Sequence, residues 1–239
     1  MRGPEREPSV EDLLEEMSLA DGKAYNEHLM PICRGEVLPN RAIPVEYILY
    51  DVWEEMRTHD RELADGILEP TFTCMRAQTD NTRLRVNEFG QYLEYREKDV
   101  GKALLSAVMR FVMGIHLSAD ELERLSPLEQ NYAKHLIVVN DIFSWEKELK
   151  ASQLGHEEGS TLCSAVIVVA TGTNLSFDAA KRILWLIVRE WELVHDDFCA
   201  EMVATGCSEA MKAYMKGLEY QLSGNEMWSR TTLRYAKLD

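Results

Sequence analysis

Three oxygen-bearing side chains at four-residue intervals are the groups of this chain best placed for chemistry: Asn140, Ser144 and Glu148. On a helix this spacing brings them to one face. An amide oxygen, a hydroxyl and a carboxylate are hard ligands of the kind that binds Mg²⁺, and Lys147 adds a cation beside Glu148. The spacing predicts a metal site that receives a phosphorylated ligand, although the same residues are also typical of a solvated helix face.

The segment that leads into this triad favours the metal site over the solvated face. Residues 133–139, Ala-Lys-His-Leu-Ile-Val-Val, are predominantly apolar and run directly into Asn140. Polar groups at core positions need partners, and a metal ion is one such partner.

A second group of oxygens lies near the start of the chain, in the run Glu-Asp-Leu-Leu-Glu-Glu at residues 11–16. Glu11 with Glu15, and Asp12 with Glu16, form pairs four residues apart, so one helix end presents several carboxylates together. This run is therefore a second candidate metal site. The alternative is an acidic first turn that is stabilised by the helix dipole.

Candidate anion-binding donors occur at two places. Arg96, within Tyr-Arg-Glu-Lys-Asp at residues 95–99, offers a planar fork to phosphate oxygens, or else forms a surface salt bridge. Arg234 and Tyr235 are adjacent donors near the end of the chain, and Trp228 precedes them by six residues. The alternative for this end is an amphipathic helix in which Trp228 fills the core.

The elements that must position these residues are helices, because almost nothing in the sequence alternates with period two. We expect an all-α protein of about ten helices without internal repeats. Asn40–Pro44 and Gly155–Gly159 are expected loops, and residues 1–10 an irregular leader. The predicted helices begin at residues 11 and 70 and near 118, and otherwise span 45–66, 88–115, 127–150, 161–170, 177–204, 208–224 and 226–235.

The composition of the chain limits which partners it can bind and indicates its cellular location. The 239 residues are 46% apolar and carry a net charge of −15, which predicts repulsion of nucleic acid and of anionic membranes. No apolar run reaches the roughly 18 residues that span a bilayer. The absence of a secretory signal and an odd count of five cysteines predict a reducing, cytoplasmic location. An acidic protein that binds a polyanion needs a basic cluster or bridging cations.

Taken together, these motifs resemble those of the class I terpene synthases. Residues 140–148 match the metal motif N-D-x-x-S-x-x-x-E of that family. Arg96 stands upstream at the distance of the family's diphosphate-sensing arginine, and Arg234-Tyr235 matches the terminal Arg-Tyr pair of microbial members. The resemblance extends over nearly everything from Asp12 onward, and is strongest to fungal members that make bicyclic sesquiterpenes such as aristolochene.

The resemblance implies a class I terpene synthase helical bundle over residues 11–239, truncated at its N-terminus, that ionises and cyclises farnesyl diphosphate. It implies that several Mg²⁺ ions bridge to the diphosphate, and that a homodimer is one assembly available to the chain. The implied metal ligands are Asn140, Ser144, Glu148, Glu11, Asp12 and Glu15. The implied diphosphate donors are Arg96, Lys147, Arg234 and Tyr235. Trp228 matches an aromatic residue that faces the carbocation, and Asp99 matches the linker after the sensor arginine.

Three departures from the family pattern stand out. Glu11 replaces the aspartate that opens the family's aspartate-rich motif, and Cys74 replaces an active-site phenylalanine, which removes a π face. The helices that precede the aspartate-rich motif in the family have no counterpart in the sequence. These departures raise an alternative hypothesis, an inactive remnant that at most binds Mg²⁺ and diphosphate or assembles with other chains.

Overall fold

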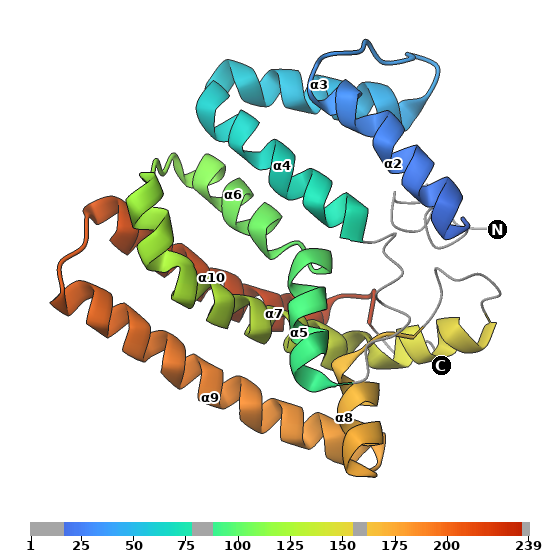
Figure 1. Cartoon of the computed structure of the whole chain (residues 1–239), viewed down its shortest axis with the longest axis vertical. Coiled ribbons are helices and arrows are strands. Elements are labelled where there is room, and N and C mark those ends of the chain that lie inside the picture. The colour runs from blue at the N-terminus through green and yellow to red at the C-terminus, as the bar shows by residue number, and fades with distance from the viewer. Residues whose placement is uncertain (1–16, 78–87, 155–161, 236–239) are drawn as a thin grey trace.

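A single long helix, α7 (Ala119–Leu154), contributes to two of the three apolar cores and carries the predicted metal triad. The computed structural model describes residues 17–77, 88–154 and 162–235. Within these ranges the chain forms helices and no strands, which confirms the all-α prediction. None of the helices described is long and apolar enough to cross a membrane. Figure 1 shows the helices, whose bounds are α2 (Leu19–Cys33), α3 (Pro44–His59), α4 (Arg61–Ala77), α5 (Phe89–Asp99), α6 (Lys102–Met113), α8 (Ala165–Thr173), α9 (Phe177–Ala204) and α10 (Glu209–Thr231).

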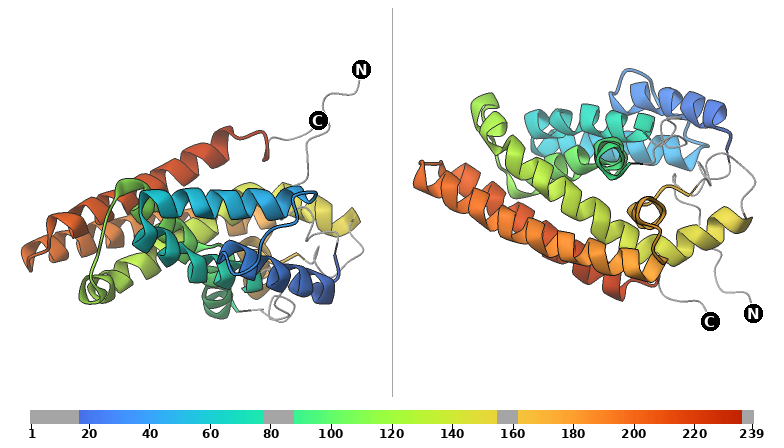
Figure 2. Two further views of the ribbon diagram at one scale, coloured as in Figure 1. Left: turned by 90° about the horizontal axis from the view of Figure 1, so that it is seen from above. Right: turned by 60° about the horizontal axis from the view of Figure 1, so that its bottom comes forward.

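The helices surround three apolar clusters. One lies between α5, α7, α8 and α9 and includes Tyr92, Ile137 and Leu184. A second joins α7 to α10 through Leu128, Tyr132 and Tyr214. Helices α9 and α10 both pack along α7, as both views of Figure 2 show.

The third cluster belongs to the layer formed by α2, α3 and α4, which packs against α6. This layer includes Met30, Trp53 and Phe72. Figure 1 shows it on the opposite side of α5 and α6 from α9. The burial of these apolar side chains is the main favourable contribution to folding.

Two helix breaks differ from the prediction. The segment 45–66 is divided between α3 and α4, because Asp60 has extended backbone (φ −153°, ψ 103°) and its Oδ1 accepts from the amide of Leu63 at 3.0 Å, which caps α4. The segment 88–115 is divided at Gly101, whose φ of 73° lies in the left-handed region that glycine tolerates.

Three helices are instead longer than predicted. Helix α4 runs through Pro70, and α7 is one helix of 36 residues that contains Pro127. Each proline removes one helical hydrogen bond, but the fully buried Leu125 and Leu128 hold the second of these turns in the core. Helix α10 runs unbroken through Gly224 and thereby replaces two predicted helices.

Candidate metal centre

The predicted triad lies on one face of the continuous helix α7, as its spacing requires. Ser144 is 3% exposed, and its Oγ has no hydrogen-bond partner of acceptable geometry in the described structure. Burial, reinforced by the negative charge of Asp141, raises the pKa of Glu148. The Ser144 hydroxyl lies close enough to the Glu148 carboxyl to lower its pKa, but it forms no well-aligned hydrogen bond. A cation would stabilise both groups, so these residues fit a divalent metal ion.

Asn140 is the point at which three distant segments meet. Its Oδ1 accepts from Nη2 of Arg96 on α5 at 3.4 Å. Its Nδ2 donates to the hydroxyl of Tyr235, beyond the end of α10, at 2.9 Å. The structure therefore brings one predicted metal ligand together with two predicted diphosphate donors, from positions 44 and 95 residues away in the sequence.

The aromatic side of the site is formed by the end of the chain. The rings of Trp228 and Tyr235 meet edge to face, with centroids 5.6 Å apart and an interplanar angle of 82°. Trp228 is 49% exposed, so the alternative in which it fills the core is wrong. Arg234 is half-buried and directly precedes Tyr235.

Lys147 is half-buried beside Glu148 on α7. Its positive charge lowers the pKa of the Glu148 carboxyl, but this effect is smaller than the opposing effect of burial. Lys147 is therefore close enough to Glu148 to act on its charge, and its role as a diphosphate donor stays a prediction.

Asp141 and Tyr92 are two site residues that the sequence analysis did not select. Asp141 is fully buried, and its carboxylate accepts hydrogen bonds from the Tyr92 hydroxyl at 2.5 Å and from the Ala165 amide at 2.7 Å. Burial raises the pKa of Asp141, while the guanidinium of Arg96 acts in the opposite direction. One feature of the sequence could have identified Asp141: it is a carboxylate directly after Asn140 in an apolar segment, and a buried carboxylate needs several hydrogen-bond donors.

Other predicted site residues are placed only in part. Glu11, Asp12 and Glu15 lie outside the described residues, as does the predicted leader at residues 1–10. Asp99 is the last residue of α5, three positions after Arg96. Cys74 lies on α4 with its Sγ 3.3 Å from the position that a Cβ of Gly101 would occupy, next to the break between α5 and α6.

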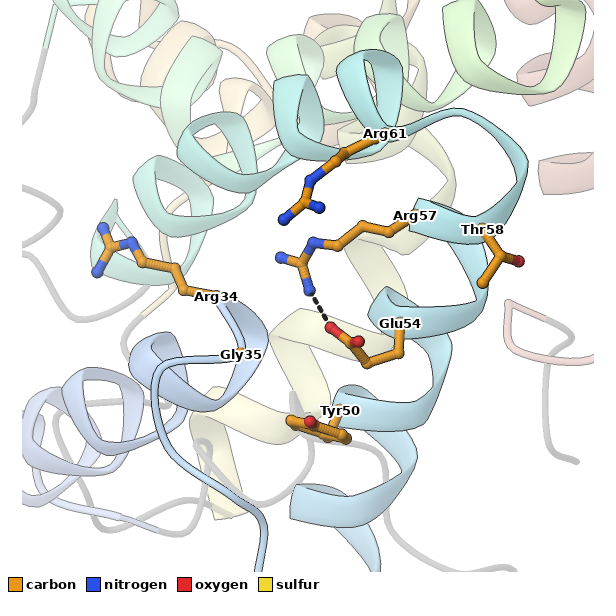
Figure 3. Close-up of a pocket in the computed structure, with 7 residues that line it drawn as sticks. All are labelled: Arg34, Gly35, Tyr50, Glu54, Arg57, Thr58 and Arg61. Atoms are coloured by element: carbon orange, nitrogen blue, oxygen red, sulfur yellow. Dashed lines mark hydrogen bonds and ion pairs between the residues drawn. The ribbon is translucent and has the colours of Figure 1, made fainter.

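A polar cavity of about 400 Å³ lies away from this site, between the end of α2 and the helices α3 and α4 (Figure 3). Its arginines are already paired: Arg34 with Glu69 at 2.9 Å, Arg57 with both Glu54 and Asp65 at 2.8 Å, and Arg61 with Asp65 at 3.6 Å. These ion pairs and the bond from Arg57 to the Cys33 carbonyl at 2.9 Å join three helices. The cavity is therefore a structural feature of the α2–α4 layer, and is lined by Arg34, Gly35, Tyr50, Glu54, Arg57, Thr58 and Arg61.

Comparison with known proteins relates this geometry to one family. Residues 10–193 match the family model described as terpene synthase family 2, C-terminal metal binding. The chain is 64% identical over 228 residues to aristolochene synthase from Penicillium roqueforti, which covers 95% of this chain and 67% of that protein. It is 57% identical to aristolochene synthase from Aspergillus terreus, over 95% of this chain and 71% of that protein.

Solved structures agree with the sequence comparison. The crystal structure of aristolochene synthase from Penicillium roqueforti superposes with a TM-score of 0.81 at 61% identity, over 93% of this chain and 74% of that one. A cucumene synthase variant superposes with a TM-score of 0.74 at 17% identity, over 92% of this chain and 74% of that one, and this match supports the fold alone. The predicted class I terpene synthase fold is confirmed.

Proposed function

We propose, from the premise that this chain belongs to the terpene synthase family, that it is a sesquiterpene cyclase. Its substrate is farnesyl diphosphate, and its products are a bicyclic hydrocarbon such as aristolochene and inorganic diphosphate. The relatives at 57–64% identity are aristolochene synthases, which supports this substrate and product class. The observation that carries the proposal is the meeting of Arg96, Asn140 and Tyr235 on the triad face of α7.

The chemical step is heterolysis of a C–O bond, in which the electron pair leaves with the diphosphate and an allylic cation remains. Asn140, Ser144 and Glu148 would hold Mg²⁺, which when bound neutralises negative charge that develops on the leaving group. Arg96, Lys147, Arg234 and Tyr235 supply N–H and O–H donors to the same oxygens, and donors fixed in place before the reaction stabilise that charge most effectively.

The allylic cation needs a surface that does not react with it. Trp228 offers a π face that attracts positive charge, and its contact with Tyr235 fixes the ring near the diphosphate donors. Cys74 contributes no such face at the position where the family has phenylalanine, so the cation is held by fewer aromatic groups on that side.

The test is the incubation of purified protein with farnesyl diphosphate and Mg²⁺, followed by gas chromatography of the volatile products. We expect a sesquiterpene hydrocarbon that disappears with EDTA. Glu148→Gln, which removes the one charged ligand of the triad, should lower kcat/KM by roughly a hundredfold or more.

The matched control is Glu146→Gln, two residues away on α7. Glu146 is exposed and pairs with Lys181 at 2.5 Å, so this variant removes one carboxylate charge from the same helix without changing the triad. It should keep wild-type turnover. If no hydrocarbon is detected above the EDTA control, the proposed activity is wrong.

A further inference from the structure

The two carboxylate oxygens of Asp141 have separate partners. Oδ2 accepts from the Tyr92 hydroxyl at 2.5 Å and from the Ala165 amide at 2.7 Å. Oδ1 accepts from Nη2 of Arg96 at 3.3 Å. Asp141 is 0% exposed, so water does not compete for either oxygen. One buried side chain on α7 is therefore bonded to both α5 and the N-terminus of α8.

The bonds to Oδ2 fix the position of the carboxylate. Burial, together with the charge of Asp141, raises the pKa of Tyr92 well above its ordinary value, so the tyrosine remains a hydrogen-bond donor at any physiological pH. Ala165 is the first residue of α8, where the helix dipole favours a negative charge. These two donors hold one oxygen and leave the other directed at Arg96.

Tyr92 and Arg96 stand four residues apart on α5, so they share one face of that helix. Asp141 accepts hydrogen bonds from both residues, from the Tyr92 hydroxyl at Oδ2 and from the Arg96 guanidinium at Oδ1. Nη2 of Arg96 also reaches Oδ1 of Asn140 at 3.4 Å. The Arg96 side chain is 15% exposed, and its guanidinium contacts Asp141 and Asn140.

We propose that Asp141 is a positioning residue for Arg96. Oδ2 anchors the carboxylate to the fold, and Oδ1 sets the orientation in which the guanidinium faces the diphosphate. The identity of the ligand, diphosphate, rests on the proposed function. The hydrogen bond between Asp141 and Arg96 does not. Asp141 lies between the predicted metal ligands Asn140 and Ser144, but the inference gives it a role in anion recognition rather than in metal binding.

Asp141→Asn tests this role selectively. The asparagine oxygen can take the place of Oδ2 and still accept from Tyr92 and Ala165, whereas its NH₂ group replaces Oδ1 and presents a donor to a donor. We expect kcat/KM for farnesyl diphosphate to fall by roughly tenfold to a hundredfold, and the Kd of inorganic diphosphate with Mg²⁺ to rise by a similar factor, as for a lost hydrogen bond to a charged group.

Two further variants separate positioning from a structural role. Ser164→Ala removes the N-cap of α8 beside Ala165 without touching Arg96, so it should lower the unfolding midpoint and leave kcat/KM unchanged. In an Arg96→Lys background, Asp141→Asn should change kcat/KM by less than about threefold, because its effect acts through the guanidinium. An equal loss in both backgrounds would overturn the inference.

A third readout needs neither substrate nor metal. Phenylglyoxal modifies guanidinium groups, and peptide mass spectrometry reports the rate at Arg96. Asp141→Asn should accelerate this reaction by roughly threefold or more, because the bond to Oδ1 is lost. An unchanged rate would overturn the inference even if the wild-type chain proved inactive, whereas an inactive wild type with an accelerated variant would overturn only the proposed function.

If Asp141→Asn does not fold, Asp141→Glu, which moves the carboxylate by one methylene, is expected to change both readouts in the same direction, and no change would overturn the inference.

Discussion

At the scale of single residues, His195 combines deep burial with unsatisfied polar atoms. It is 2% exposed on α9, and neither ring nitrogen has a hydrogen-bond partner within the described parts of the chain. Asp196 and Glu219 face it with negative charge and His135 lies nearby, but burial dominates and lowers its pKa. Burial likewise lowers the pKa of His135, whose Nε2 contacts Glu192 at 3.0 Å.

This arrangement predicts a loss of stability in mild acid. Because the folded-state pKa of His195 lies below its ordinary value of 6.5, the unfolded chain binds more protons than the folded one below that pH. The free energy of unfolding should therefore decrease as the pH falls from about 6.5, by up to about 1.4 kcal/mol per pH unit for each histidine. Urea denaturation at pH 5.5, 6.5 and 7.5 measures the slope.

His195→Phe should flatten this pH dependence and cost little stability at pH 7.5, because it removes a buried group that lacks partners. His59→Phe, at an exposed position on α3, is the matched control and should retain the wild-type slope. An unchanged slope in His195→Phe would contradict the assignment.

At the scale of elements, the start of α7 and the start of α10 share one set of caps. Ser208 caps α10 by accepting from the Met211 amide at 3.1 Å, and it also donates to Oε1 of Glu121 at 2.6 Å. Oε2 of Glu121 accepts in turn from the amide and hydroxyl of Ser118, just before α7, at 2.9 and 3.0 Å. These bonds lower the pKa of Glu121.

Ser208→Ala should consequently destabilise the protein by about 1–2 kcal/mol, because it removes one cap and a support of another. Ser176→Ala is the control: Ser176 caps α9 through the Ala179 amide alone at 3.3 Å, so the expected loss is about 0.5–1 kcal/mol. Denaturation midpoints of both variants provide the comparison. Equal losses would show that the bond to Glu121 adds nothing.

The elements also show which parts of the fold the sequence could predict. The bounds of α9 agree with the prediction because Ser176 and the change after Ala204 are local signals. The break at Gly101 and the continuity through Pro127 are decided by packing against other helices, which a local pattern does not contain. Glycine and proline in those segments permit either outcome, and the buried neighbours select one.

At the scale of the whole molecule, the net charge of −15 bears on how a diphosphate binds. The arginines of the α2–α4 cavity are paired with carboxylates, so that layer offers no excess of positive charge. This is consistent with the proposal that the diphosphate binds at the triad face of α7, where bound metal ions would supply positive charge.

We therefore expect Mg²⁺ and inorganic diphosphate to stabilise the protein together more than the sum of either alone. At ligand concentrations of about 100 times Kd, the linkage corresponds to about 2.7 kcal/mol, or a rise in Tm of about 5–10 °C for a chain of this size. Differential scanning fluorimetry measures it, with Glu146→Gln as the control for Glu148→Gln. An equal shift by diphosphate without Mg²⁺ would contradict the bridging role of the metal.

The same titration addresses the inactive remnant. That alternative predicts the Tm shift without hydrocarbon product, whereas the cyclase gives both. The 64% identity to an aristolochene synthase over 95% of this chain favours the enzyme.

The sequence could predict those parts of the site whose residues lie close together in the chain. Asn140, Ser144 and Glu148 lie on one helix, so their spacing was enough to predict their shared face, while the metal site itself came from the family resemblance. The contacts of Arg96 and Tyr235 with Asn140 join positions far apart in the chain. The family resemblance had named both residues as diphosphate donors, but it did not predict these contacts. The bond between Tyr92 and Asp141 had no such guide, since neither residue belongs to the predicted ligand set.

The Cys74 sulfur lies 3.3 Å from the point that a Cβ of Gly101 would occupy, so the side chains that positions 74 and 101 can carry depend on one another. Gly101 needs its left-handed φ of 73° to end α5, and its missing side chain leaves space directly in front of the Cys74 sulfur. A larger residue at position 74, such as the phenylalanine of the family, would have to use that space. Glycine at 101 is therefore the condition under which position 74 could accept a larger side chain on this side.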